Sequence, residues 1–105
     1  MRVIEKPWGK ETLFALSDKY AGKIIDVVKG RKLSLQRHLV KEEDVYIVKG
    51  RALVYLEEGA TVSIPRGVKH RIEAVSDLRL FEVSTPELDD VVRYEDDYGR
   101  EDTAK

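Results

Sequence analysis

The stretch "GRKLSLQRHLVKEEDVYIVKG", residues 30–50, decides which fold this chain can adopt. It is rich in residues that favour strands and is bounded by two glycines. Alternate side chains of a strand share one face, so Ser34, Gln36 and His38 are expected to point the same way. Burying such polar groups costs free energy unless a partner satisfies them. Three kinds of partner would do so: a metal ion, a hydrogen-bonded core, or water in a cleft.

Outside this stretch, the chain is a series of short apolar or alternating segments separated by residues that favour turns, such as Gly22, Gly59 and Pro65-Arg66-Gly67. Regularly spaced short strands with frequent turns indicate an all-β sandwich or barrel. In "VKGRALV", Gly50 is expected to form the turn of a hairpin. The expected strands are 11–16, 23–28, 32–39, 45–48, 51–57, 60–64, 70–75, 78–84 and 90–95.

Length and composition narrow the class of protein. A chain of 105 residues fits a single domain. Its 19 basic side chains nearly balance 20 acidic ones, so no basic excess is available for nucleic acid. Charged residues make up 37% of a chain without cysteine, which is typical of proteins from thermophiles. No apolar run is long enough to span a membrane, and the start of the chain lacks the apolar region of a signal peptide, so a cytoplasmic location is expected.

Two histidines and a glutamate are the candidate metal ligands. His38 and His70 are far apart in the sequence, and Glu43 begins the segment that follows His38. Imidazole nitrogens together with carboxylate and amide oxygens inside a barrel would suit zinc, manganese, iron or nickel rather than calcium. The residues alone leave open that both histidines are ordinary structural or surface residues.

The spacing of these residues resembles the two motifs of the cupin superfamily. In the first motif, Gly30 is followed by Gln36-x-His38, Glu43 and Gly50 at the superfamily's intervals, with Gln36 in place of the first histidine. In the second motif, Gly59, Pro65-x-Gly67 and His70 match, but Ala74 stands where the superfamily usually has asparagine. The resemblance implies one small cupin β jelly-roll barrel over residues 1–105, with an N-terminal arm (1–10), motifs at 30–50 and 59–74, and a tail (89–105). It also implies that one metal ion is held by Gln36, His38, Glu43 and His70.

A closer resemblance is to the C-terminal cupin domain of type II mannose-6-phosphate isomerases. The blocks that carry it are "KPWG" (6–9), "LSLQRH" (33–38), "IPRGVKHR" (64–71) and "DDVVRYEDDYGR" (89–100). Glutamine at position 36 is part of that family's own signature. The chain departs from the family at two positions near the first motif: Lys41 stands where the family has arginine, and Val45 where it has tryptophan. Lysine cannot replace the planar two-pronged contact of arginine.

This resemblance implies a metal-dependent isomerase that interconverts an aldose phosphate and a ketose phosphate. Lys41 and Glu43 are the expected catalytic residues, and Lys41, Arg93 and Arg100 are expected to bind a sugar or sugar phosphate. The cofactor is one divalent ion: zinc, manganese, iron, cobalt or nickel. A homodimer is expected, with neither nucleic acid nor membrane as a partner. The alternative is a cupin that binds a metal or a small sugar without isomerase activity.

Overall fold

The chain is built from antiparallel strands. The computed structural model describes residues 1–53, 61–64, 66–67, 70–95 and 98–99. These residues form ten strands, which confirms the all-β class, and none of them belongs to a helix that could cross a membrane. The strands are β1 (Arg2–Lys6), β2 (Gly9–Leu16), β3 (Ala21–Val27), β4 (Leu35–Arg37), β5 (Glu43–Lys49), β6 (Ala52–Leu53), β7 (Thr61–Ile64), β8 (Glu73–Ala74), β9 (Leu78–Ser84) and β10 (Val92–Glu95).

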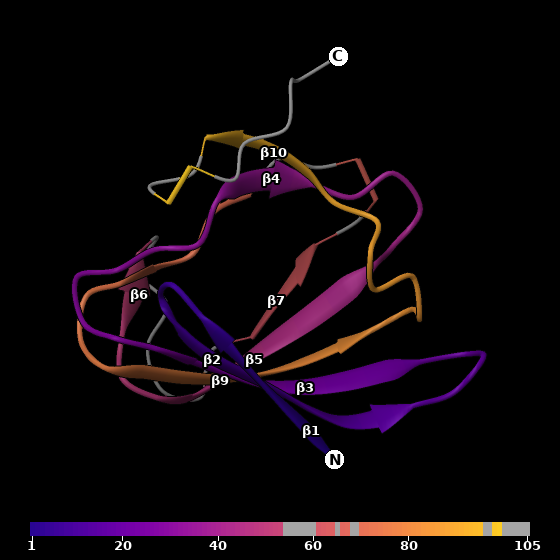
Figure 1. The fold of residues 1–105 in the computed structure, drawn as a ribbon, viewed down its shortest axis with the longest axis horizontal. Coiled ribbons are helices and arrows are strands. Elements are labelled where there is room, and N and C mark those ends of the chain that lie inside the picture. Colours follow the sequence, from indigo (N-terminus) through magenta and orange to yellow (C-terminus); the bar gives the residue numbers. More distant parts are fainter. Residues whose placement is uncertain (54–60, 65, 68–69, 96–97, 100–105) are drawn as a thin grey trace.

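Six strands form the larger wall of the barrel, in the order β1-β2-β3-β9-β5-β7 (Figure 1). The sequence of β9, "LRLFEVS", alternates between buried and exposed residues along its whole length. Its interior positions begin with Leu78 and Leu80, which meet the apolar side chains of the neighbouring strands. In the register of the sheet, Leu80 lies between Ile25 of β3 and Ile47 of β5. These residues belong to the hydrophobic core, together with Trp8.

Two short sheets complete the barrel: β4 pairs with β10, and β6 pairs with β8. Figure 1 shows β4 and β10 opposite the larger sheet. Backbone hydrogen bonds between Gln36 and His70 attach β4 to the segment that leads into β8. Tyr98, close to the C-terminus, packs against the core. The tail therefore contributes to the second wall of the barrel.

Gly50 does not form the predicted hairpin. β5 pairs with β9 and β7, whereas β6 pairs with β8, so the chain leaves one sheet at Gly50 and enters another. Gly50 has a φ of +88°, and a Cβ atom there would lie 2.1 Å from the carbonyl oxygen of Asp77. Only glycine fits this crossing. The hairpin prediction was wrong because a turn residue in the sequence does not reveal which strand the next segment will pair with.

The bounds of several other strands also differ from those expected. Much of the N-terminal arm, residues 1–10, is regular structure that belongs to β1 and the start of β2. The strand expected over 32–39 shortens to β4, and the one expected over 70–75 shortens to β8. Of the strand expected over 51–57, only β6 falls within the described residues. The shortened strands lie next to the segments that carry His38 and His70.

Candidate metal centre

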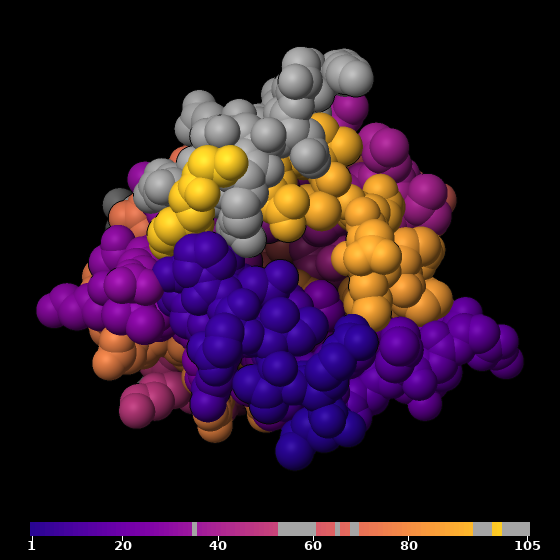
Figure 2. Space-filling model, in the orientation of Figure 1, coloured from indigo at the N-terminus to yellow at the C-terminus, as the bar shows by residue number. Residues whose placement is uncertain are grey.

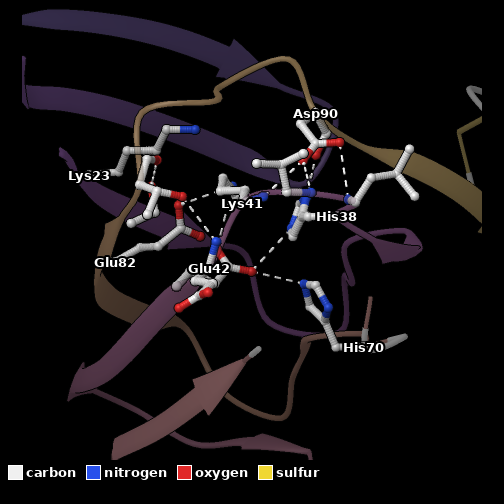
Figure 3. A network of polar contacts seen from close by, with 12 residues as sticks. Lys23, His38, Lys41, Glu42, His70, Glu82 and Asp90 are labelled. Atoms are coloured by element: carbon white, nitrogen blue, oxygen red, sulfur yellow. Dashed lines mark hydrogen bonds and ion pairs between the residues drawn. The ribbon is translucent and has the colours of Figure 1, made fainter. Parts of the chain in front are cut away.

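Three side chains from separate parts of the barrel meet at one point. His38 follows β4, Glu43 is the first residue of β5, and His70 lies in the segment that pairs with Gln36. The Nε2 atoms of His70 and His38 lie 3.0 Å and 3.2 Å from Oε1 of Glu43. One ligand atom from each residue lies within 4.8 Å of the others. Figure 3 shows the rings of His38 and His70 turned toward a common carboxylate.

The donor set and its spacing fit a divalent metal ion. Two imidazole nitrogens and a carboxylate oxygen are ligands that transition metals share. Ligand atoms bound at about 2.1 Å and at right angles lie roughly 3.0 Å apart, close to the two observed separations. His38 and Glu43 are 4% and 5% exposed, so both are shielded from bulk water. The cluster could therefore hold a metal ion, in agreement with the expected cofactor.

A backbone contact fixes the orientation of His38. Its Nδ1 atom lies 2.5 Å from the backbone carbonyl oxygen of Asp90. A carbonyl oxygen can only accept a hydrogen bond, so Nδ1 carries the hydrogen. With Nδ1 engaged by this carbonyl, Nε2 is the ring nitrogen that faces Glu43. Histidines that bind metals commonly use the second ring nitrogen in this way.

Gln36 joins the two cupin motifs through its backbone. Its N–H donates to the carbonyl of His70 at 2.9 Å, and the N–H of His70 donates back at 2.8 Å. The side chain of Gln36 borders the same cavity as the two histidines and Glu43. Its role as a fourth ligand stays a prediction.

A row of charged residues extends from the candidate metal centre across the larger sheet. Nζ of Lys41 lies 3.5 Å from Oε2 of Glu43 and 3.8 Å from Oε2 of Glu82. Nζ of Lys23 lies 3.1 Å from Oε1 of Glu11, and Lys23 is opposite Glu82 in the β3–β9 register. Buried charges are tolerated only when they are paired. Lys23 is paired with Glu11 and Lys41 with Glu43, so both cations of the row meet that condition.

The surroundings separate the pKa values of two adjacent carboxyl groups. Burial is the main cause that raises the pKa of Glu82 to about 8, and the neighbouring Glu43 adds to it. Burial alone would also raise the pKa of Glu43. Hydrogen bonds with His38, His70 and Glu82, together with the charge of Lys41, outweigh burial and hold that pKa well below its usual range. Near neutral pH, Glu43 is therefore ionised, and Glu82 keeps its proton.

The proton on Glu82 also provides a hydrogen bond that two buried carboxyl oxygens would otherwise lack. Without it, Oε2 of Glu43 and Oε2 of Glu82 are buried and have no hydrogen-bond partner within the part of the chain that the structure describes. Buried polar atoms are rarely left in that condition. A protonated Glu82 next to an ionised Glu43 supplies the missing donor.

These side chains surround a cavity of about 110 Å³. Figure 2 shows a hollow between the N-terminal strands, in indigo, and the orange segment that precedes β10. Drug-sized ligands usually occupy pockets of roughly 300–1,000 Å³, so this cavity suits a small polar molecule or one end of a longer one. Other residues that line it include Lys6, Trp8, Leu88, Val91 and Arg93.

The three predicted substrate-binding residues have different surroundings. Lys41 is 4% exposed, and its ammonium group faces two carboxyl groups rather than open solvent. Arg93, in β10, borders the cavity. Arg100 lies outside the described residues. The substrate-binding roles of all three, and the catalytic roles expected of Lys41 and Glu43, stay predictions.

Glu82, Lys23 and Glu11 also line the cavity, although neither motif of the sequence marks them. A signal for Glu82 was available in the alternation of β9, because it shares its parity with the buried Leu78 and Leu80. Lys23 likewise shares its parity with the buried residues of β3. A charged residue at an interior position of a strand requires a partner, and it therefore marks a candidate site.

The sequence as a whole matches a known protein family. The profile described as "Mannose-6-phosphate isomerase C-terminal" matches residues 1–96. The chain belongs to this family. The mannose-1-phosphate guanylyltransferase of Salmonella montevideo is 36% identical over 111 residues, which cover 94% of this chain and 24% of that protein. The xanthan biosynthesis protein XanB of Xanthomonas campestris is 34% identical over the same length, with the same coverage.

The chain thus spans about a quarter of the length of these relatives. Two solved structures establish its fold. An RmlC-like cupin protein from Desulfovibrio desulfuricans has a TM-score of 0.67 at 17% identity, covering 81% of this chain and 83% of its own. A protein with a double-stranded β-helix domain from Klebsiella pneumoniae has a TM-score of 0.72 at 12% identity, covering 79% of this chain and 76% of its own. The predicted cupin barrel and the predicted family are both confirmed.

Proposed function

We propose that this chain is a metal-dependent sugar-phosphate isomerase that interconverts mannose 6-phosphate and fructose 6-phosphate. The observation that carries the proposal is the convergence of His38, Glu43 and His70 on one cavity, in a member of the mannose-6-phosphate isomerase C-terminal family. A divalent ion, when bound, supplies Lewis-acid stabilisation to the sugar oxygens during isomerisation. His38, Glu43 and His70 would hold it, with Gln36 as the predicted fourth ligand.

The other charged groups of the cavity are assigned to the sugar. Isomerisation moves a proton between C1 and C2, which requires a base within reach of both carbons. A carboxylate that coordinates a cation keeps little basicity, so we assign this step to Glu82 rather than to the expected Glu43. The ionised form of Glu82 is the base, and it becomes populated as the pH approaches its pKa of about 8. Lys41, between the two carboxyl groups, donates a hydrogen bond to a sugar oxygen in this scheme.

We assign the phosphate end of the substrate to the mouth of the cavity. A volume of about 110 Å³ accommodates only part of a hexose phosphate, so the phosphate would lie outside the metal centre. Arg93 borders the cavity and can form the paired hydrogen bonds that phosphate oxygens accept.

The test is an assay of mannose 6-phosphate to fructose 6-phosphate conversion after loading the chain with zinc, manganese, cobalt or nickel. We expect activity with at least one ion. Glu43→Gln should remove it because the variant loses an anionic ligand. Glu42→Gln is the matched control, since Glu42 is exposed and pairs with Arg66 on the surface. A metal-loaded chain that converts no hexose or pentose phosphate would overturn the proposal.

The second candidate is a cupin that binds a metal and a small sugar without turning the sugar over. The pairing of Lys41 favours it, because an ammonium group already engaged by two carboxyl groups is less available to a substrate. The same assay separates the two candidates: a non-catalytic cupin would bind the ion and the sugar and release the sugar unchanged.

The expected homodimer stays a prediction, which sedimentation of the purified chain would test.

A further inference from the structure

Asp90 makes an unusual set of contacts with residues 38–41, the turn between β4 and β5 that begins with His38. Its carboxylate accepts hydrogen bonds from the backbone N–H groups of Leu39 at 3.1 Å, Val40 at 2.7 Å and Lys41 at 2.9 Å. Its backbone carbonyl accepts the hydrogen bond from Nδ1 of His38. Figure 3 shows Asp90 beside His38, at the end of the network away from Glu82. One residue of the tail therefore contacts four consecutive residues of the turn.

Within the part of the chain that the structure describes, the backbone of residues 39–41 has few other contacts. The side chains of Leu39 and Val40 are 56% and 52% exposed, so they contribute little burial. The other described backbone hydrogen bonds of the turn lie at its two ends. The carbonyl of His38 accepts from Gly67, and Glu42 exchanges hydrogen bonds with Thr85. Among the described residues, the carboxylate of Asp90 therefore holds the backbone of residues 39–41 between these ends, while the side chain of Lys41 is held by its ion pairs.

This turn places two groups of the cavity. His38 is its first residue, and the ammonium group of Lys41 reaches Glu43 and Glu82 from its far side. A shift of the backbone in this turn would rotate the imidazole of His38 away from Oε1 of Glu43, which lies only 3.2 Å from Nε2 of the ring. Three charge-assisted hydrogen bonds to one carboxylate restrict such movement more than neutral contacts would.

We propose that Asp90 is a positioning residue for the metal centre: it fixes the turn that orients His38. This proposal rests on the metal-binding part of the proposed function and is independent of isomerase activity. It also gives a role to the block "DDVVRYEDDYGR", to which Asp90 belongs and for which the fold alone offers only barrel closure. Losing a group that orients a metal ligand typically weakens metal affinity by about 10- to 100-fold.

The first measurement is the affinity of the chain for Zn²⁺ or Co²⁺, by competition with a chromophoric chelator. We expect Asp90→Ala to raise the dissociation constant by about 10- to 100-fold. Asp89→Ala is the matched control, because Asp89 precedes it and is exposed, and its affinity should stay within about 2-fold of wild type. Ile47→Val, in the apolar core, controls for general destabilisation: it should lower the melting temperature without changing the affinity.

The second measurement uses the metal-free chain and so does not depend on metal binding. The ¹⁵N shift of Nδ1 in the His38 imidazole reports whether this nitrogen carries a hydrogen and donates it. We expect a hydrogen-bonded Nδ1–H in the wild type and in Asp89→Ala, and a weakened Nδ1–H hydrogen bond, seen as a changed Nδ1 shift, in Asp90→Ala. An unchanged Nδ1 shift and unchanged affinity in Asp90→Ala would overturn the proposal. A wild type that binds no ion, yet shows the changed Nδ1 shift in Asp90→Ala, would overturn the metal centre and leave the positioning of His38 by Asp90 standing.

Discussion

The interior of the barrel has an apolar half and a charged half, and the same strands build both. Ile25, Leu80 and Ile47 lie side by side on β3, β9 and β5, each at most 2% exposed. Two residues further along β3 and β9, the interior pair is Lys23 and Glu82. The backbone pairing is the same in both rows. The sheet therefore supplies interior positions, and the side chains alone decide whether a position stabilises the fold or carries chemistry.

The two halves are held together by different forces. The apolar half gains free energy from buried area, about 25 cal/mol per Å². The charged half has to offset the cost of removing ions from water, and its pairs and hydrogen bonds do so only when they are complete. Substitutions in the apolar half should therefore change stability and leave metal binding unaffected. Substitutions in the charged half should change metal binding, and they should lower stability only where they leave a buried charge unpaired.

The largest expected effect on stability comes from the apolar half. Leu80→Ala removes a side chain with 0% exposure and leaves a cavity, so we expect a loss of about 2–5 kcal/mol in the free energy of unfolding. Metal affinity of the folded variant should equal that of the wild type. Phe81→Ala is the control, because Phe81 points to the outer face and is 41% exposed. Chemical denaturation gives the stabilities, and an equal loss in both variants would contradict the comparison.

His70→Ala tests the charged half. Removing one of three converging ligand atoms should lower metal affinity by more than about 100-fold, a larger effect than losing an orienting group. The melting temperature of the metal-free variant should stay close to that of wild type, because His70 lies at the edge of the cavity and not in the apolar core. Titration calorimetry and thermal melts measure the two quantities. A large fall in the metal-free melting temperature would show that the charged half also supports the fold.

The smallest expected effect is a slope in the pH dependence of stability. In the metal-free chain, the pKa of Glu82 is raised from 4.5 to about 8, so between these values the folded state holds a proton that the unfolded state has lost. Stability should therefore fall as pH rises through this window, by up to about 1.4 kcal/mol per pH unit. Glu82→Gln should flatten the slope. Urea unfolding at several pH values, with a chelator present, measures it, and an identical slope in both proteins would refute the assignment.

Motif spacing predicted much of the site but not all of it. The intervals from Gly30 to Gly50 and from Gly59 to His70 correctly indicated that His38, Glu43 and His70 meet, because motif intervals fix where a strand begins and which way its side chains point. They did not reveal Glu82. Its place beside Glu43 depends on the pairing of β9 with β5, a long-range register that no local interval contains.

Local patterns failed in the same way elsewhere. Gly50 was correctly identified as a break between strands, but its crossing to another sheet depends on the close approach of Asp77. Lys41 was singled out from the sequence because it lies near the first motif. Its pairing with Glu43 and Glu82 could not be predicted, because it requires knowing that β9 runs alongside β5. Strand parity was the unused signal, since it marks charged interior positions without any knowledge of pairing.

The backbone link between Gln36 and His70 has a consequence for local opening of the barrel. His38 and His70 lie next to the short strands β4 and β8, on the side of the barrel opposite the larger sheet (the smaller wall), and Glu43 comes from β5 of the larger sheet. An ion bound by all three would cross-link the walls, and separating them would require its release. Amide hydrogens of β4 and of the first residues of β5 should then exchange with deuterium more slowly as the ion concentration rises, while those of β1, at the edge of the larger sheet, exchange at an unchanged rate.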